Sequence, residues 1–313
     1  MIAAFAPATV SNVACGFDVL GFALDTPGDV VVAEAAAAAG VEIVAIEGDE
    51  GRLSREPAQN TAGAAVEALL TRLGAARGIR LTIYKGIPLA SGVGSSGASA
   101  VAAVVAVNEL LGRPAPLDVL FECAMQAEVA GCGAAHPDNV APALYGGFVL
   151  ARAHALPDGS SDIIRLPVPE GLSCAVLHPH LEVHTGEARA LLGEAVPLAA
   201  AVRQWGNVGG LVAGLFLNDL PLVARTLEDH VAEPRRAHLV PGFVQVKQAA
   251  ASAGALGCSL SGSGPSMFAL CSSLERAELV GEAMRQVFAQ VSDIGSDLWV
   301  SPVGRRGARI VAA

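Results

Sequence analysis

The chain has 313 residues, of which 52% are hydrophobic and 16% charged, and it carries a formal net charge of −10. This composition excludes intrinsic disorder, whose signature is low hydrophobicity, and it can form the core of one large or two ordinary domains. The acidic balance argues against a nucleic-acid-binding surface, which requires a basic patch.

The N-terminal segment and the cysteines indicate the cellular compartment of the protein. No charged leader precedes the first apolar residues, so we expect no signal peptide. We also expect no membrane span, because the best apolar run, residues 98–108, is short and rich in alanine. The six cysteines lack metal-type spacing and are typical of structural thiols in a reducing cytoplasm.

The first half of the chain alternates between patterns typical of strands and of helices. Strands are predicted over 1–10, 28–47 (broken at Gly40), 79–86 and 145–153, and helices over 60–74, 100–112 and 116–131. Residues 6–25 place Asn12 and Asp18 among apolar residues, in a predicted loop and helix start.

A polar, turn-rich segment at 154–162 is the best candidate for a domain boundary. Beyond it we predict strands over 163–169, 172–179 and 296–304, a strand–loop–strand unit over 255–273, and helices over 186–196, 198–217, 220–229, 241–254 and 278–292. Hairpin-like pairs outnumber strict strand–helix alternation, which favours an α+β architecture.

Residues 86–99, GIPLASGVGSSGAS, form a glycine- and serine-rich loop before a predicted helix. Its glycines let backbone N–H groups approach an anion, and the N-terminus of a helix favours negative charge. Such loops are also common caps and turns. The spacing matches neither the Walker nor the dinucleotide pattern, so we predict a phosphorylated ligand, a nucleotide, held by another scheme. A second such loop lies within SLSGSGPSMFAL, residues 259–270.

These two loops and the 6–25 segment, in this order, resemble the motifs of the GHMP kinase superfamily over essentially the whole chain. PLASGVGSSGA resembles the family's phosphate loop, with Val93 for the usual Leu and Gly97 for the usual Ala. The resemblance implies ATP as the nucleotide. It implies nucleotide binding by Asn60, Pro88, Leu89, Ala90, Ser91, Gly92, Val93, Gly94, Ser95, Ser96, Gly97, Ser261, Gly262, Ser263 and Gly264.

Within the superfamily, the N-terminal motif is similar to that of the homoserine kinases. No basic residue follows Pro7, as it does in mevalonate kinases and galactokinases, and SNVACGFDVLG resembles the homoserine kinase version. Segments 127–148, 184–189 and 233–243 resemble further homoserine kinase motifs.

The resemblance also implies a substrate site for the zwitterion L-homoserine. Asn12 and Asp18 would take its ammonium group. Arg189 and Arg236 would clamp its carboxylate, for which the planar guanidinium is suited. The implied neighbours of the reacting hydroxyl are His136, Asn139 and Thr185, with Asp138 in support.

Each of these residues also has a plainer interpretation. Asp18 could be a helix cap, His136 an ordinary loop histidine, and the arginines solvated surface residues. Arg235 is an alternative to its neighbour Arg236.

Phosphoryl transfer also needs charge neutralisation, usually by Mg²⁺. Ser96 and Glu128 match the family's metal-ligating serine and glutamate, although Glu128 could equally face solvent. Asn60 matches a position that lines the adenine pocket, and it is also a good helix N-cap.

The resemblance therefore implies a two-domain GHMP kinase fold. An N-terminal domain of the left-handed β-α-β type would span residues 1–155, and a ferredoxin-like C-terminal domain residues 156–313. The implied reaction is transfer of the ATP γ-phosphate to the homoserine hydroxyl, on the route to threonine, in a cytoplasmic enzyme; homodimers are common in the family.

Two other functions are kept as alternatives: a GHMP kinase for another small alcohol, and a non-enzymatic ATP-binding regulator of the same fold. On the mechanism, we expect transfer without a dedicated base, by positioning and electrostatic stabilisation. The alternative makes Asp18 the base.

Overall fold

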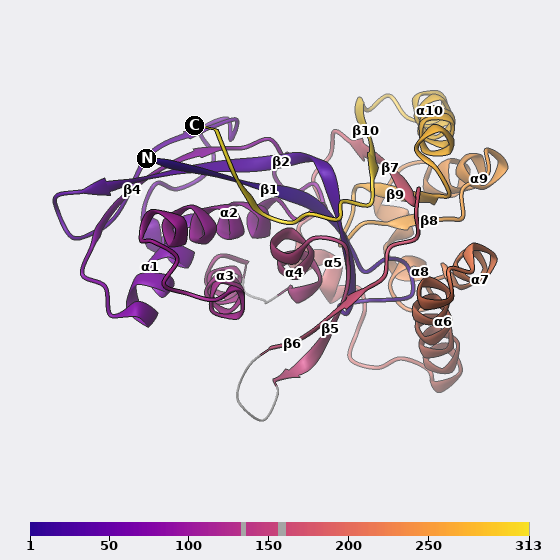
Figure 1. Cartoon of the computed structure of the whole chain (residues 1–313). Helices are drawn as coiled ribbons and strands as arrows, with labels where there is room; N and C mark the ends of the chain where they lie inside the picture. The colour runs from indigo at the N-terminus through magenta and orange to yellow at the C-terminus, as the bar shows by residue number, and fades with distance from the viewer. Residues whose placement is uncertain (133–135, 156–160, 313) are drawn as a thin grey trace.

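The computed structural model describes residues 1–132, 136–155 and 161–312 and contains two β-sheets flanked by helices (Figure 1). The α+β architecture predicted from the sequence is confirmed, because most neighbouring strands in both sheets are antiparallel.

The larger sheet is built mainly from the first half of the chain. Its strands follow the order β11-β1-β2-β4-β3, and β5 and β6 extend it from β2. Their bounds are β1 Ile2–Ser11, β2 Leu20–Ala36, β3 Gly40–Glu47, β4 Gly78–Tyr84, β5 Phe148–Ala155, β6 Ser161–Leu166 and β11 Arg309–Val311. Since β11 pairs with β1, the two ends of the chain lie at the same end of the molecule (Figure 1).

Four helices gather beneath this sheet: α1 Thr61–Leu73, α2 Ser95–Leu110, α3 Leu117–Cys132 and α4 Pro137–Tyr145 (Figure 1). The central one, α2, contacts β1, β2, α1, α3 and α4. Its alanines and valines are buried around nearly its whole circumference, as expected for a helix packed on all sides. Small side chains at these positions let α2 lie close to the sheet, and its N-terminus is thereby fixed.

The smaller sheet has the strand order β10-β7-β9-β8, and all its pairs are antiparallel. Its strands are β7 Ser173–Pro179, β8 Gly257–Leu260, β9 Met267–Cys271 and β10 Ser296–Pro302. Numbered within this unit, the order is 4-1-3-2, that of the predicted ferredoxin-like fold. Helices α9 Phe243–Ser252 and α10 Leu274–Val291 pack on it.

The remaining helices follow β7 and precede β8 in the chain, within the part that forms the smaller sheet. They are α5 Thr185–Ala190, α6 Leu198–Leu217, α7 Leu220–Thr226 and α8 Glu233–Arg236, with short 3-10 turns at Pro57–Gln59 and Ala237–Leu239. None of the helices in the described ranges has the length and apolar character that crossing a membrane requires.

The structure departs from the sequence expectations at several elements. The helix start predicted within residues 6–25 is wrong: residues 12–19 form turns, and β2 already begins at Leu20. Positive φ angles at Asn12 (67°), Val13 (42°) and Ala14 (56°) rule out a right-handed helix there. Helices α4 and α8 and strand β11 were not predicted at all.

The predicted division between residues 155 and 156 adjoins residues 156–160, which lie outside the described part of the chain. Both β6 and β11, which follow that division in sequence, pair within the larger sheet. The division therefore stays a prediction.

Candidate active site

A cavity of about 530 Å³, here called the central cavity, brings together residues from both halves of the chain. It is lined by most of the predicted site residues: Asn12, Asp18, Asn60, Leu89, Ala90, Ser91, Gly92, Gly94, Ser95, Ser96, Glu128, His136, Asn139, Thr185, Arg189, Arg236, Gly262 and Ser263. Asp138 lines it as well. Its size suits a small-molecule ligand.

Five residues of the predicted nucleotide loops are not among those that line the central cavity: Pro88, Val93, Gly97, Ser261 and Gly264. Val93 is fully buried, and its carbonyl accepts from the backbone N–H of Thr9 at 3.0 Å, which ties the loop to β1. Gly97 faces α4, where an added Cβ would lie 3.4 Å from Val140. These residues support the loops by packing.

The first glycine loop ends at the N-terminus of α2. Gly94 precedes the helix in a left-handed conformation (φ 74°), and an added Cβ would lie 2.2 Å from the Thr9 hydroxyl. No side chain caps this end of the helix, so its first N–H groups remain available to an anion.

The second glycine loop packs directly on the first. The Ser261 hydroxyl donates to the carbonyl of Gly92 at 2.7 Å. A Cβ on Gly92 (φ 78°) would lie 2.5 Å from the carbonyl oxygen of Gly264. Only glycine permits this approach, so the two loops form one continuous wall.

Glu128, on α3, reaches the same wall as a buried acid. Its side chain is 3% exposed, and its Oε1 atom has no hydrogen-bond partner in the described structure. Burial raises the pKa of Glu128, against a hydrogen bond with Ser96 and the charge of Lys85, which lower it. A buried carboxylate oxygen without a partner beside a serine hydroxyl fits a hard cation such as Mg²⁺.

That site would need oxygen ligands from outside the protein. The described residues hold no group of three or more His, Cys, Asp or Glu side chains placed to bind a metal ion. Mg²⁺ commonly binds through one or two protein ligands plus phosphate oxygens and water. Ser96 and Glu128 therefore suit a cation that arrives with a nucleotide.

Lys85, which the sequence analysis did not single out, also lines the central cavity. Its ammonium group forms an ion pair with Asp29 and donates to the Ser99 hydroxyl (2.8 Å) and the Ser95 carbonyl (2.9 Å). The side chains of Lys85 and Asp29 are 2% and 0% exposed. The sequence feature that could have identified Lys85 as a site residue is its position at the end of a predicted strand, just before the first glycine loop.

Asp18 and Asn12 lie together in the turn between β1 and β2. The Asn12 side-chain oxygen accepts from the backbone N–H of Asp18 at 3.0 Å, and its Nδ2 donates to the carbonyl of Gly262 at 2.8 Å. Arg189, on α5, donates to the Asp18 carboxylate at 2.6 Å. Asp18 also has a positive φ of 59°. Strained non-glycine backbone of this kind is characteristic of functional sites.

Arg236 approaches the same place from α8. It is 3% exposed, and its guanidinium donates to the carbonyls of Ala188 (3.0 Å) and Gly262 (3.3 Å). Arg236 and Arg189 both lie over the ring of Phe17, at 5.3 and 5.6 Å. The neighbouring Arg235 is exposed and is not among the residues lining the cavity. The geometry therefore favours Arg236 over Arg235.

The N-cap residue and the first turn of α4 bring three more polar groups to the cavity. Asn139 accepts from the Thr9 hydroxyl at 2.9 Å. Asp138 accepts from the backbone N–H of Asn12 at 3.1 Å, and burial, reinforced by the charge of Asp18, raises its pKa to about 7. Burial lowers the pKa of His136, whose Nδ1 atom has no hydrogen-bond partner in the described structure. These groups can donate to or accept from a bound hydroxyl without carrying a full charge.

The position of Asn60 is compatible with both roles considered from the sequence, helix N-cap and neighbour of the adenine. Its side-chain oxygen accepts from the backbone N–H of Ala62 at 3.0 Å, which makes it the N-cap of α1, and it also lines the central cavity. Thr185, the first residue of α5, lines the cavity too.

Comparison with known proteins agrees with this architecture. The family model described as "GHMP kinases N terminal domain" matches residues 60–147, and the one described as "GHMP kinases C terminal" matches residues 211–290.

Full-length relatives and solved structures are also similar. A homoserine kinase of Chlorobium phaeobacteroides is 49% identical over 98% of this chain and 98% of its own. The crystal structure of homoserine kinase from Cytophaga hutchinsonii superposes with a TM-score of 0.94 at 51% identity, over 99% of this chain and 97% of that one. A Lactococcus lactis galactokinase, at 14% identity and a TM-score of 0.62 over 98% of this chain and 94% of that one, shares the fold. The chain thus belongs to the homoserine kinases of the GHMP kinase family.

Proposed function

We propose that the chain transfers the γ-phosphate of ATP to the hydroxyl group of L-homoserine and forms O-phospho-L-homoserine, on the route to threonine. The observation that carries the proposal is the charge arrangement at one place in the central cavity. One carboxylate, Asp18, lies there with two guanidinium groups, Arg189 and Arg236. This arrangement matches an ammonium and a carboxylate carried on the same small molecule.

The nucleotide is proposed to bind along the wall formed by the two glycine loops. The free N–H groups at the start of α2 and the helix dipole would stabilise its phosphates. Asn60 is proposed to border the adenine. Ser96 and Glu128 would hold Mg²⁺, whose charge would offset that of the phosphates.

The acceptor hydroxyl is proposed to lie near α4. Asn139 is held by Thr9, and His136 offers an unpaired ring nitrogen, so both can orient the hydroxyl. Thr185 contributes a further hydroxyl to the cavity wall. Holding the hydroxyl next to the γ-phosphate makes a bimolecular reaction effectively unimolecular.

We propose that no dedicated base removes the hydroxyl proton. Asp18 is the obvious candidate, but its carboxylate is already engaged by Arg189 at 2.6 Å. A loose transition state permits the proton to leave late, so positioning and charge stabilisation suffice.

The test is ADP formation by the purified protein with ATP, Mg²⁺ and a panel of alcohols. We expect turnover with L-homoserine, and much slower turnover with 4-hydroxybutyrate, which lacks the ammonium, and with homoserine amide, which lacks the carboxylate. Equal rates with an uncharged alcohol would point to another acceptor. ATP binding without ADP formation under all conditions would identify a regulator. The cytoplasmic location and the homodimer implied by the resemblance stay predictions.

A further inference from the structure

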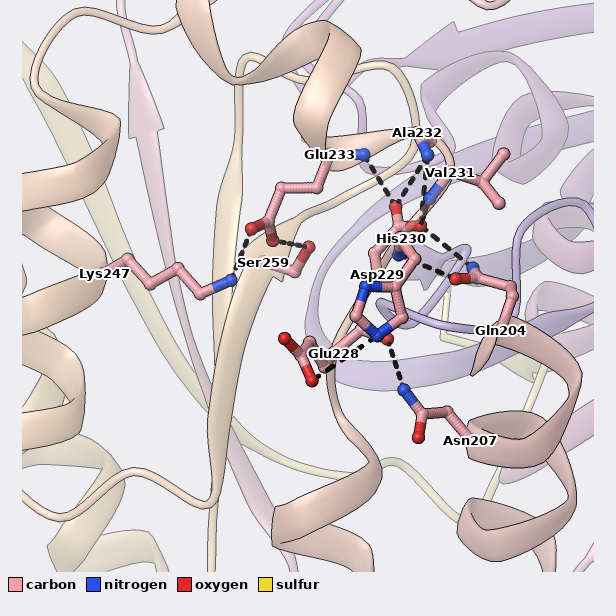
Figure 2. Close-up of polar contacts among 10 residues, drawn as sticks. All are labelled: Gln204, Asn207, Glu228, Asp229, His230, Val231, Ala232, Glu233, Lys247 and Ser259. Atoms are coloured by element: carbon pink, nitrogen blue, oxygen red, sulfur yellow. Dashed lines mark hydrogen bonds and ion pairs between the residues drawn. The ribbon is translucent and has the colours of Figure 1, made fainter. Parts of the chain in front are cut away.

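The side-chain amide of Gln204 joins the two protein segments that carry Asp18 and Arg236. Figure 2 shows its bonds to Asp229 and His230. Gln204 lies on α6 and is 9% exposed. Its Nε2 donates to the carbonyl of Cys15 at 2.8 Å and to the carboxylate of Asp229 at 2.9 Å. Its Oε1 accepts from the backbone N–H of His230 at 2.7 Å. Both ends of the amide therefore have partners.

One of these bonds reaches the turn that presents Asp18. Cys15 lies three positions before Asp18 in the segment 12–18, four of whose non-glycine residues have positive φ. Such backbone persists only where surrounding contacts hold it. The bond from Gln204 is a contact of this kind, and it comes from a helix about 190 residues away along the chain.

The other bonds reach the segment that presents Arg236. The Asp229 carboxylate accepts from the backbone N–H groups of Val231 (2.8 Å), Ala232 (3.0 Å) and Glu233 (2.7 Å). These bonds fix the chain as it enters α8, and Figure 2 shows them converging on the one carboxylate. Arg236 lies at the end of that short helix, so the placement of Asp229 sets the placement of the guanidinium.

Glu233 fastens the same helix to the smaller sheet and to α9, which packs on it. Its carboxylate accepts from Lys247 on α9 at 2.5 Å and from the Ser259 hydroxyl on β8 at 2.6 Å (Figure 2). Helix α8 is thus anchored on the side of the smaller sheet by Glu233, and tied to the turn of Asp18 through Asp229 and Gln204.

We propose that Gln204 is a positioning residue that sets the spacing between Asp18 and Arg236 and thereby the affinity for the zwitterionic acceptor. The proposal rests on the proposed function, in which these two residues bind opposite ends of L-homoserine. Gln204 is not among the described residues that line the central cavity, so it acts through Cys15 and Asp229.

Two substitutions separate this role from simple space filling. Gln204→Met keeps the length of the side chain and removes all three hydrogen bonds. Gln204→Glu keeps the shape and the acceptor for His230, but a carboxyl group offers at most one donor where the amide supplies two, so it cannot bond to both Cys15 and Asp229. We expect the KM for homoserine to rise about tenfold or more in both variants, because small displacements at such sites are costly. The KM for ATP should change less than about twofold, since neither glycine loop bonds to Gln204.

The matched control is Asn207→Leu. Asn207 lies one turn further along α6 and donates to the carbonyl of Glu228 at 3.0 Å, without a bond to the turn of Asp18. The homoserine KM of the Asn207→Leu variant should stay within about twofold of the wild-type value. Melting temperatures of all three variants report on folding.

The outcomes are distinct. Absence of homoserine turnover in the wild-type protein would refute the proposed function itself. An active wild type whose Gln204→Glu variant keeps a normal homoserine KM would refute the positioning role, since shape alone would then matter. Parallel rises in the KM values for ATP and homoserine would also refute it, because they indicate a general structural defect. Should Gln204→Met fail to fold, the isosteric Gln204→Glu variant still decides.

Discussion

The substitution Arg236→Ala tests the acceptor site most directly. Arg236 is buried and donates to two backbone carbonyls, which hold its guanidinium in place before any ligand binds. Removing one partner of a buried, hydrogen-bonded charge pair costs about 2–4 kcal/mol in binding. At 1.36 kcal/mol per factor of ten, this predicts a fall in kcat/KM for homoserine of about 30- to 1,000-fold. Arg236→Lys should fall between wild type and alanine, because lysine keeps the charge and loses the planar fork.

The neighbouring residue supplies the control. Arg235 is exposed, and its Nη1 lies 3.5 Å from the carbonyl of Leu191, so Arg235→Ala should change kcat/KM by less than about twofold. Steady-state ADP formation with homoserine varied at saturating ATP measures both variants, and melting temperature reports on folding. The reasoning is refuted if Arg235→Ala is the damaging change, or if Arg236→Ala acts on the KM for ATP and leaves that for homoserine unchanged.

Three further predictions concern the acids of the central cavity. Glu128→Gln should raise the Mg²⁺ concentration needed for half-maximal activity about tenfold or more. In EDTA at alkaline pH the same substitution should raise the melting temperature, because ionisation of a buried carboxyl group with a raised pKa destabilises the folded wild-type protein. Asp138 has a pKa raised from 3.8 to about 7, so its contribution to stability is complete below about pH 4 and is lost as pH rises through about 7. Asp138→Asn should remove this total change of roughly 4 kcal/mol in the free energy of unfolding, measured by denaturant unfolding across the same pH range. Asp18→Asn should raise the KM for homoserine more than it lowers kcat, whereas a collapse of kcat at unchanged KM would make Asp18 the base.

The glycine loops could be predicted from the sequence because their chemistry is local. Gly92 and Gly94 have φ angles of 78° and 74°, which are easy only for glycine. The helix that follows is set by an uninterrupted run of alanine and valine. Spacing along the chain was therefore enough to predict that the glycine loop leads into the start of α2.

The turn of Asp18 could not be predicted in the same way. Its apolar residues fit a helical pattern, and the positive φ angles at Val13 and Ala14 are unusual for such side chains. What holds them is tertiary: the bond from Gln204 to Cys15 comes from α6. Local propensity carries no information about such a contact.

Lys85 and Asp29 illustrate a second limit. The two residues are 56 positions apart and meet only because β2 pairs with β4. Asp29 lies in the middle of β2 and Lys85 directly follows β4, and a sequence without the pairing register gives no reason to join them. Once joined, the lysine is neutralised by Asp29, so it adds little net positive charge to the cavity.

Under the proposed function, the ion pair between Asp18 and Arg189 gives a site in an acidic protein a way to select a zwitterion. In the free chain these two side chains satisfy each other at 2.6 Å. An ammonium drawn to Asp18 frees the guanidinium of Arg189 for a carboxylate, so a ligand with both charges replaces one ion pair by two. A ligand that carries only an ammonium group leaves Arg189 without a partner. A ligand that carries only a carboxylate leaves Asp18 without a partner. The side chains of Arg189 and Asp18 are 44% and 41% exposed, so water can solvate whichever group is left unpaired and the penalty is small. Selectivity for the amino acid would therefore come mainly from the attraction of both charges at once.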